Sequence, residues 1–114
     1  MNIFEGTRND FLNLLKTNPG IMIFKFGAEW CKPCQEIKGL IDTLTLNLPE
    51  NIVFYDVDVD ESFDLYAFMK TKKMVRGIPT ILRYNAGNDS YISDDSISGT
   101  NEKEITTFFT GCKI

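Results

Sequence analysis

Apolar residues recur along the chain at two spacings, every three to four positions in some segments and almost continuously in others. The first spacing is typical of amphipathic helices and the second of buried strands. Near the N-terminus, Thr7 is predicted to cap a helix that ends at the turn 18–20, where a proline precedes a glycine. The apolar side of this helix consists of Phe11, Leu12, Leu14 and Leu15. Residues 21–26 are apolar except for Lys25 and predict a largely buried strand.

The middle of the chain continues this alternation of helix and strand. A second helix is predicted to begin near Cys34 and to end before Pro49, since proline cannot continue a helix. Its apolar residues, three or four positions apart, are Ile37, Ile41, Leu44 and Leu48. Residues 51–57 are rich in β-branched and aromatic side chains and predict the next strand.

The remaining pattern predicts a helix, a hairpin and a last helix. Ser62 is predicted to cap the first of these helices. Residues 80–84 are expected to form a strand, and residues 91–98 its antiparallel partner after a turn. The last helix is predicted to open at Thr100 or Asn101. Its apolar face consists of Ile105, Phe108, Phe109 and Cys112.

The predicted order is helix, strand, helix, strand, helix, strand, strand, helix. Early alternation favours right-handed crossovers between parallel strands, whereas the late hairpin adds antiparallel strands. We therefore expect an α/β fold in which a mixed central sheet is flanked by helices on both faces. With 114 residues, the chain is expected to form a single domain, residues 1–114.

Composition and charge narrow the classes of function. Hydrophobic residues make up 43% of the chain and charged residues 25%, as in ordinary soluble proteins. A net charge of −4 and the lack of a basic cluster argue against binding to nucleic acid or to anionic membranes. The first residues lack the pattern of a secretory signal, and no apolar run is long enough to span a bilayer. We therefore expect the protein to work in the reducing cytoplasm.

Cysteine is the residue type that points to chemistry. The chain has three cysteines and no histidine, which rules out cysteine–histidine and serine–histidine catalytic pairs. The motif Trp30-Cys31-Lys32-Pro33-Cys34 joins the buried strand to the second helix. Its spacing brings both sulfurs within disulfide reach, and a helix N-terminus favours a thiolate at Cys31. Pro33 suits an early helical position, where its missing N–H costs nothing.

Other polar and sulfur-bearing residues are expected to have lesser roles. A C-x-x-C pair is also half of many zinc sites, but such a site needs two more ligands and only Cys112 remains, so we expect no metal. Cys112 is expected to be a buried apolar side chain, the alternative being a reactive thiol at a frayed terminus. The carboxylates expected to be merely solvated are Glu29, Asp58, Asp60 and Glu61.

Two separated motifs resemble the thioredoxin family. The segment 28–34 resembles its active-site sequence, and Arg76-Gly77-Ile78-Pro79-Thr80 resembles the loop whose cis-proline faces the disulfide. Residues 56–60 resemble the third strand, and the order of elements matches from about Phe4 to the C-terminus. The resemblance implies a thioredoxin fold and a protein-disulfide reductase that cycles between dithiol and disulfide.

The resemblance also implies roles for particular residues. Cys31 would be the exposed nucleophile and Cys34 the buried resolving thiol. The Ile78–Pro79 bond would be cis, and an extended substrate would bind along Gly77, Ile78 and Pro79 beside the apolar rim of Trp30. No cofactor is bound, because electrons pass through the dithiol. The implied partners are disulfide-containing proteins and a thioredoxin-reductase-like electron donor, and we expect a monomer that serves electron transport and cell redox homeostasis.

Lys25 is the most informative departure from the family. Thioredoxins usually carry a buried aspartate there, and Asp56 falls near the position of that aspartate's lysine partner in bacterial members. One interpretation is a swapped Lys25–Asp56 ion pair whose ammonium stabilises a thiolate. The others are a neutral lysine acting as a base, or a lysine that extends to solvent and has little effect. Lys32 replaces the usual glycine and would either favour the thiolate or remain solvated. Gly27 stands where an aromatic residue is frequent and would loosen packing near the site.

Two alternatives to a reductase remain open at the level of sequence. Lys25 and Lys32 motivate a more oxidising protein, an oxidase or isomerase, although the apparent lack of a signal peptide opposes it. A redox-independent module would dock a partner through Trp30 and Pro79. The presence of both motif cysteines weighs against such a docking module.

Overall fold

The structure is a computed structural model that describes residues 2–112, so residues 1, 113 and 114 of the predicted domain lie outside the described part. Nine elements follow one another along the chain: β1 (Asn2–Phe4), α1 (Arg8–Leu15), β2 (Ile21–Gly27), α2 (Lys32–Thr45), β3 (Ile52–Asp58), α3 (Phe63–Thr71), β4 (Thr80–Asn85), β5 (Asp95–Ser98) and α4 (Glu102–Thr110). The predicted α/β class is confirmed.

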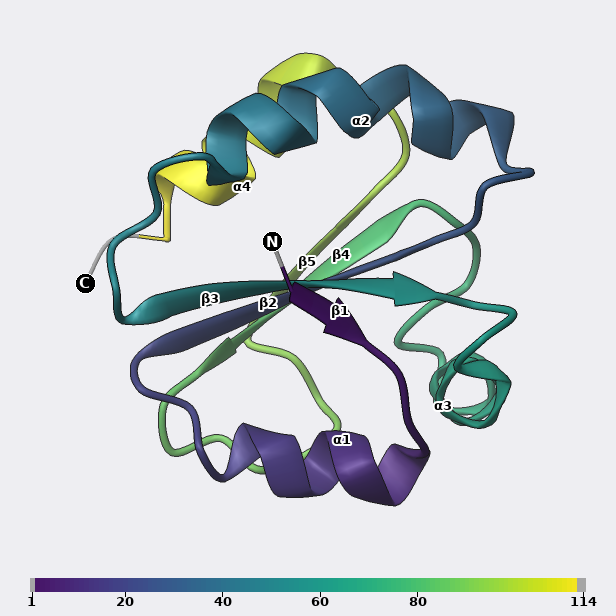
Figure 1. Cartoon of the computed structure of the whole chain (residues 1–114), viewed down its shortest axis with the longest axis vertical. Coiled ribbons are helices and arrows are strands. Elements are labelled where there is room, and N and C mark those ends of the chain that lie inside the picture. The colour runs from purple at the N-terminus through teal and green to yellow at the C-terminus, as the bar shows by residue number, and fades with distance from the viewer. Residues whose placement is uncertain (1, 113–114) are drawn as a thin grey trace.

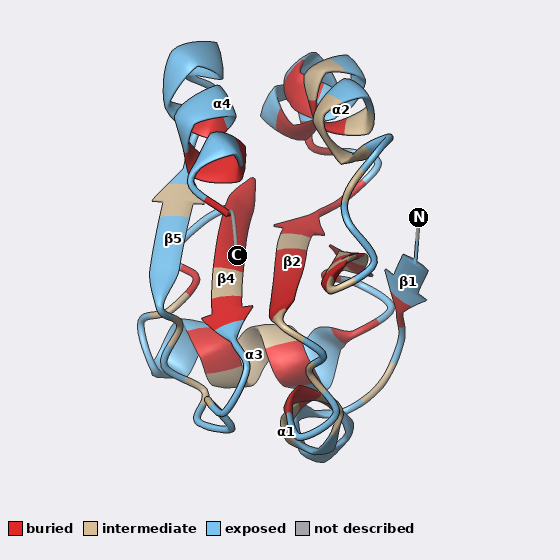
Figure 2. Cartoon of the chain, turned by 90° about the vertical axis from the view of Figure 1, so that its left-hand side faces the viewer, coloured by how far each residue is buried: buried red, intermediate tan, exposed pale blue. Residues whose placement is uncertain are grey.

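The strands form one mixed sheet in the order β1-β3-β2-β4-β5. β1, β3 and β2 run parallel, while β4 runs antiparallel to β2 and β5 antiparallel to β4. Helices α1 and α3 cover one face of the sheet, and α2 and α4 cover the other (Figure 1). The central strands β2 and β4 are largely buried, whereas β5 is an exposed edge (Figure 2).

Alternate side chains of β2 enter two separate cores. Phe24 and Phe26 pack in the core beneath α1 and α3, and Ile21 and Ile23 pack in the core beneath α2 and α4. Because successive side chains of a strand point to opposite faces, Lys25 lies on the α2 face of the sheet. The only charged residue of β2 is therefore placed between the sheet and the helix that carries the cysteine motif.

The strand directions bring two loops that are distant in sequence together at one end of the central strands. β2 ends at Gly27, and the loop that follows it leads through Cys31 into α2. β4 begins at this same end, since Thr80 pairs with Phe26. The residues just before Thr80, which include Pro79, therefore lie next to the cysteine motif.

Some boundaries differ from the sequence prediction. β1 was not predicted; it is only three residues long and pairs at the sheet edge, so its pattern is too short to recognise. α2 begins at Lys32 rather than near Cys34, because Cys31 takes the N-cap position and Pro33 fits the first turn. It ends at Thr45, so Leu48 packs on the core from the following loop.

The hairpin and the third helix also depart from expectation. β5 begins at Asp95, and the preceding residues form a loop in which the Asp94 carboxylate accepts hydrogen bonds from the Asn85 backbone and the Asn88 amide. Ser62 occupies the N-cap of α3, but its hydroxyl donates to the Phe4 carbonyl instead of capping the helix. Within residues 2–112, none of the helices is both long and apolar enough to cross a membrane.

Candidate active site

The N-terminus of α2 holds the two cysteines of the motif. Cys31 is the N-cap residue, and its Sγ accepts a hydrogen bond from the backbone N–H of Cys34 at 3.2 Å. The two sulfurs are joined in a disulfide, with the Cα atoms 5.2 Å apart. A sulfur at this position faces the free amides and the positive end of the helix dipole, which favours a thiolate once the disulfide is reduced.

The loop before β4 lies against the disulfide. The Ile78–Pro79 peptide bond is cis, as the resemblance implied, and the Ile78 carbonyl oxygen lies 3.9 Å from Cys31 Sγ. The buried hydroxyl of Thr80 donates to the Gly77 carbonyl at 2.6 Å and holds the loop in place. Residues 77–79 are therefore held beside the sulfur of Cys31.

The sulfurs differ in surroundings more than in exposure. Cys31 has only 5% of its surface exposed and Cys34 2%, so the expectation of an exposed Cys31 is wrong for this disulfide form. The Ile78 carbonyl on one side and the bond to Cys34 on the other account for its burial. Cys34, unlike Cys31, also lines a cavity on the inner side of the motif.

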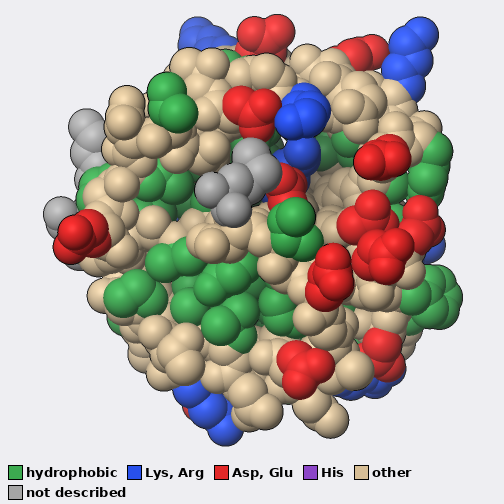
Figure 3. Space-filling view, viewed as in Figure 1, with side chains coloured by type: hydrophobic (Ala, Val, Ile, Leu, Met, Phe, Trp, Pro, Cys, Tyr) green, Lys and Arg blue, Asp and Glu red, His purple; other side chains and the backbone are tan. Residues whose placement is uncertain are grey.

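Trp30 forms an apolar rim beside the disulfide. Its side chain is exposed, and its indole N–H donates to Asp60 Oδ2 at 2.7 Å. Asp60 thus fixes the orientation of the indole, a role that the sequence interpretation missed because a carboxylate in an acidic loop carries no signal of its partner. Acidic side chains gather on this side of the molecule, to the right of the view, where β3 ends (Figure 3). Lys32, on the opposite flank of Cys31 in the motif, is exposed.

Lys25 and Asp56 meet behind the disulfide. They are direct partners in the β2–β3 register, and Lys25 Nζ lies 3.7 Å from Asp56 Oδ1. Only 11% of the Lys25 side chain is exposed, which excludes the interpretation that it extends into solvent. Burial raises the pKa of Asp56, and the ammonium of Lys25 opposes that increase. The structure therefore contains the Lys25–Asp56 ion pair that the sequence suggested.

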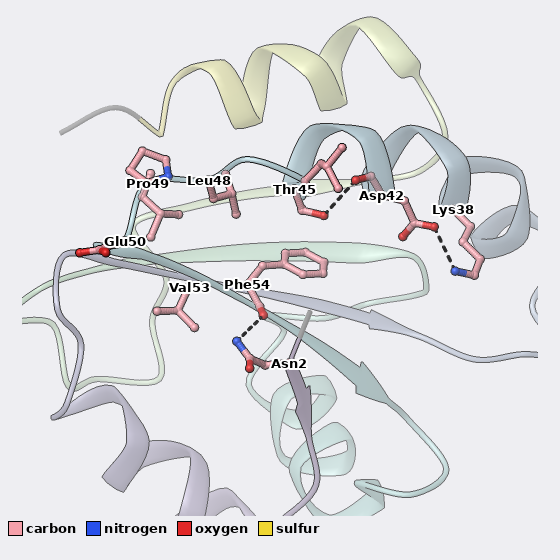
Figure 4. A pocket seen from close by; sticks show the side chains of 11 residues that line it. Asn2, Lys38, Asp42, Thr45, Leu48, Pro49, Glu50, Val53 and Phe54 are labelled. Atoms are coloured by element: carbon pink, nitrogen blue, oxygen red, sulfur yellow. Dashed lines mark hydrogen bonds and ion pairs between the residues drawn. The ribbon is translucent and has the colours of Figure 1, made fainter.

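Another hollow on the α2 side of the sheet is not part of this site. It has a volume of about 490 Å³ and lies between the C-terminal part of α2 and the strands β1 and β3 (Figure 4). The Lys38–Asp42 pair stands at one end and Glu50 at the other, and between them Asn2 donates to the Phe54 carbonyl (Figure 4). Neither cysteine of the motif lines it.

Cys112 is buried, as expected, but it lies just beyond the end of α4 rather than within the helix. Its thiol donates to the Phe108 carbonyl at 3.2 Å. Burial raises the pKa of this thiol, which disfavours the reactive thiolate. The alternative of a reactive thiol at a frayed terminus is therefore not supported by the fold.

Comparisons with known proteins agree on one family. The family model described as Thioredoxin matches residues 2–110. A thioredoxin from Geodia cydonium is 30% identical over 103 residues, covering 88% of this chain and 92% of the relative, and one from Ictalurus punctatus is 34% identical over 86 residues, covering 75% and 73%. The structure of Fasciola hepatica thioredoxin superposes with a TM-score of 0.77 at 27% identity, covering 99% of this chain and all of the other. Trichomonas vaginalis thioredoxin has the same fold, with a TM-score of 0.78 at 24% identity, covering 99% and 97%.

Proposed function

Because this chain belongs to the thioredoxin family, we propose that Cys31 attacks the disulfide of a partner protein and that Cys34 resolves the intermediate. The chain is a thiol–disulfide oxidoreductase, a protein disulfide reductase of the thioredoxin type. The observation that carries the assignment of roles is the disulfide at the N-terminus of α2, with Cys31 facing the cis-proline loop and Cys34 facing inward.

The first step is nucleophilic attack by Cys31. In the reduced protein, its thiolate receives the Cys34 N–H hydrogen bond and the helix dipole, both of which stabilise the negative charge. The thiolate attacks one sulfur of the substrate disulfide. A bond forms between that sulfur and Cys31, the substrate S–S bond breaks, and the other substrate sulfur leaves as a thiolate and is protonated.

The second step is resolution by Cys34. Its thiol loses a proton and attacks the Cys31 sulfur of the mixed disulfide, forming the Cys31–Cys34 bond and releasing the second substrate thiolate. Two electrons have then passed from the dithiol to the substrate, which takes up two protons. A thioredoxin-reductase-like donor returns two electrons to the Cys31–Cys34 disulfide and completes the cycle.

The substrate would bind as an extended segment across the loop at residues 77–79. Its disulfide would reach Cys31 between the Ile78 backbone and the Trp30 ring, which offers a flat apolar surface to many partners. Lys32 and Pro33 would support the site from the first turn of α2. We place the protein in the cytoplasm as a monomer, where it would reduce disulfide-containing proteins and serve redox homeostasis.

The reduction potential of the Cys31–Cys34 pair tests the direction of this cycle. We expect the pair, equilibrated with glutathione buffers and assayed by alkylation of free thiols, to lie nearer the ~−270 mV of thioredoxin than the ~−180 mV of protein disulfide isomerase. Cys112→Ser provides the control, since it removes the one thiol outside the motif. A potential at or above ~−180 mV would contradict the reductase and favour an oxidase or isomerase.

A further inference from the structure

A cavity of about 210 Å³ lies behind the disulfide, between α2 and the strands β2 and β3. Cys34 forms part of its wall, and Lys25, Gly27 and Asp56 form the wall on the sheet side. The resolving sulfur therefore lines the same hollow as a charged pair of the sheet. The Lys25 side chain is only 11% exposed, so solvent screens its charge less than it screens a charge at the surface.

Lys25 directs its side chain into this space. It projects from the α2 face of β2, and little of it is exposed. Its ammonium lies 3.7 Å from Asp56, which is longer than the 2.7–3.2 Å of an N–H···O hydrogen bond. The ion pair is therefore loose, and Asp56 only partly neutralises the charge of the Lys25 ammonium.

Gly27 leaves the path from Lys25 to Cys34 open. It follows Lys25 by two residues, so the two positions lie on the same face of β2. A β-carbon built on Gly27 would lie 3.3 Å from Cys34 Sγ and 3.9 Å from Lys25 Cε. A β-carbon at position 27 would thus contact both the sulfur of Cys34 and the end of the Lys25 side chain. Because residue 27 is glycine, no side chain lies between them.

We propose that Lys25 is a positioning residue for the redox pair, whose ammonium acts through the Gly27 gap to stabilise the thiolate that Cys34 forms. This inference rests on the proposed function, in which Cys34 must lose a proton before it attacks Cys31. Burial of Cys34 disfavours a thiolate, and a cation in the same cavity offsets that cost. Stabilising the thiolate also favours the reduced form, so Lys25 makes the couple more oxidising.

The other charges around the cavity do not replace Lys25. Asp56 and Asp58 on β3, Glu29 in the loop and Asp42 on α2 are acids, and each would oppose a thiolate. Lys38 on α2 is the other base that lines the cavity, but its side chain is 58% exposed and paired with Asp42 at 3.2 Å. On β4, the neighbour of Lys25 is the apolar Ile81.

A Lys25→Met variant tests the proposal, since methionine fills similar space without the charge. We expect the equilibrium constant for reduction of its disulfide by glutathione to fall about tenfold, a shift of about 30 mV for this two-electron couple. We also expect the thiolate absorbance of the reduced variant to appear about one pH unit higher than in the wild type. Lys25→Arg, which keeps the positive charge, should restore both values.

Lys38→Met is the matched control, because it removes the other lysine that lines the same cavity. It should change the equilibrium constant by less than about twofold, since an exposed charge is screened. An unchanged constant in Lys25→Met, or an equal change in Lys38→Met, would overturn the proposal. Both measurements use glutathione alone, so a failure to reduce protein substrates would contradict the proposed function without affecting this test.

Discussion

A Cys34→Ser variant is expected to accumulate a covalent mixed disulfide with its substrate, whereas a Cys31→Ser variant accumulates none. Cys31 faces the cis-proline loop, so we expect it to form the intermediate, which Cys34 would then resolve. Both variants should lose more than about a thousandfold in turnover, since serine is a far weaker nucleophile than a thiolate. Non-reducing electrophoresis and intact mass measurement detect the adduct.

Cys112→Ser provides the control for these two variants. The thiol is buried at the end of α4, outside the site, so its removal should leave turnover within about twofold of the wild type. The assignment of roles is wrong if Cys31→Ser traps the substrate and Cys34→Ser does not. Trapping by both variants would mean that either sulfur can attack first.

The second large effect concerns the stability of the core that supports β2. We expect Phe24→Ala to lower the free energy of unfolding by about 3–5 kcal/mol, a large part of the total for a domain of this size. Phe24 is fully buried and its ring contacts four others, stacking on Tyr55 at 5.1 Å between centroids. The remaining three rings, packed edge to face at 4.8–6.3 Å, are Phe4, Phe11 and Tyr84.

Urea denaturation of the oxidised protein measures this change, with Phe63→Ala as the matched control. The Phe63 ring is 66% exposed, and its loss should cost less than about 0.5 kcal/mol. A Phe24→Ala variant within about 1 kcal/mol of the wild type would show that the aromatic cluster is not the main support of the α1 face. Equal effects in both variants would lead to the same conclusion.

The sequence predicts most of the fold because long elements repeat their pattern over many residues. The apolar run of β2, the spacing of Ile37 and Ile41 in α2 and the capping Thr7 all appear where expected. Thr7 even closes a reciprocal hydrogen-bond pair with Asp10. Short elements such as β1 are not predicted, since three edge residues do not repeat a pattern.

The site is predictable only in part, for a different reason. The two motifs place Cys31, Cys34 and Pro79 by local sequence, and the order and direction of the strands bring the two loops together. The pairing of Lys25 with Asp56 depends on the β2–β3 register, and a shift of one residue would turn one of them to the other face. The hydrogen bond from Trp30 to Asp60 depends likewise on the fold of a loop.

The central claim is that the Cys31–Cys34 pair reduces disulfides of proteins, and the rate of insulin reduction by dithiothreitol tests it most directly. We predict that catalytic amounts of the wild-type chain accelerate the precipitation of insulin in proportion to their concentration. Prior alkylation of the reduced chain at Cys31 should abolish the acceleration. A rate equal to that of dithiothreitol alone, measured on a chain whose Cys31–Cys34 disulfide forms normally, would contradict the account.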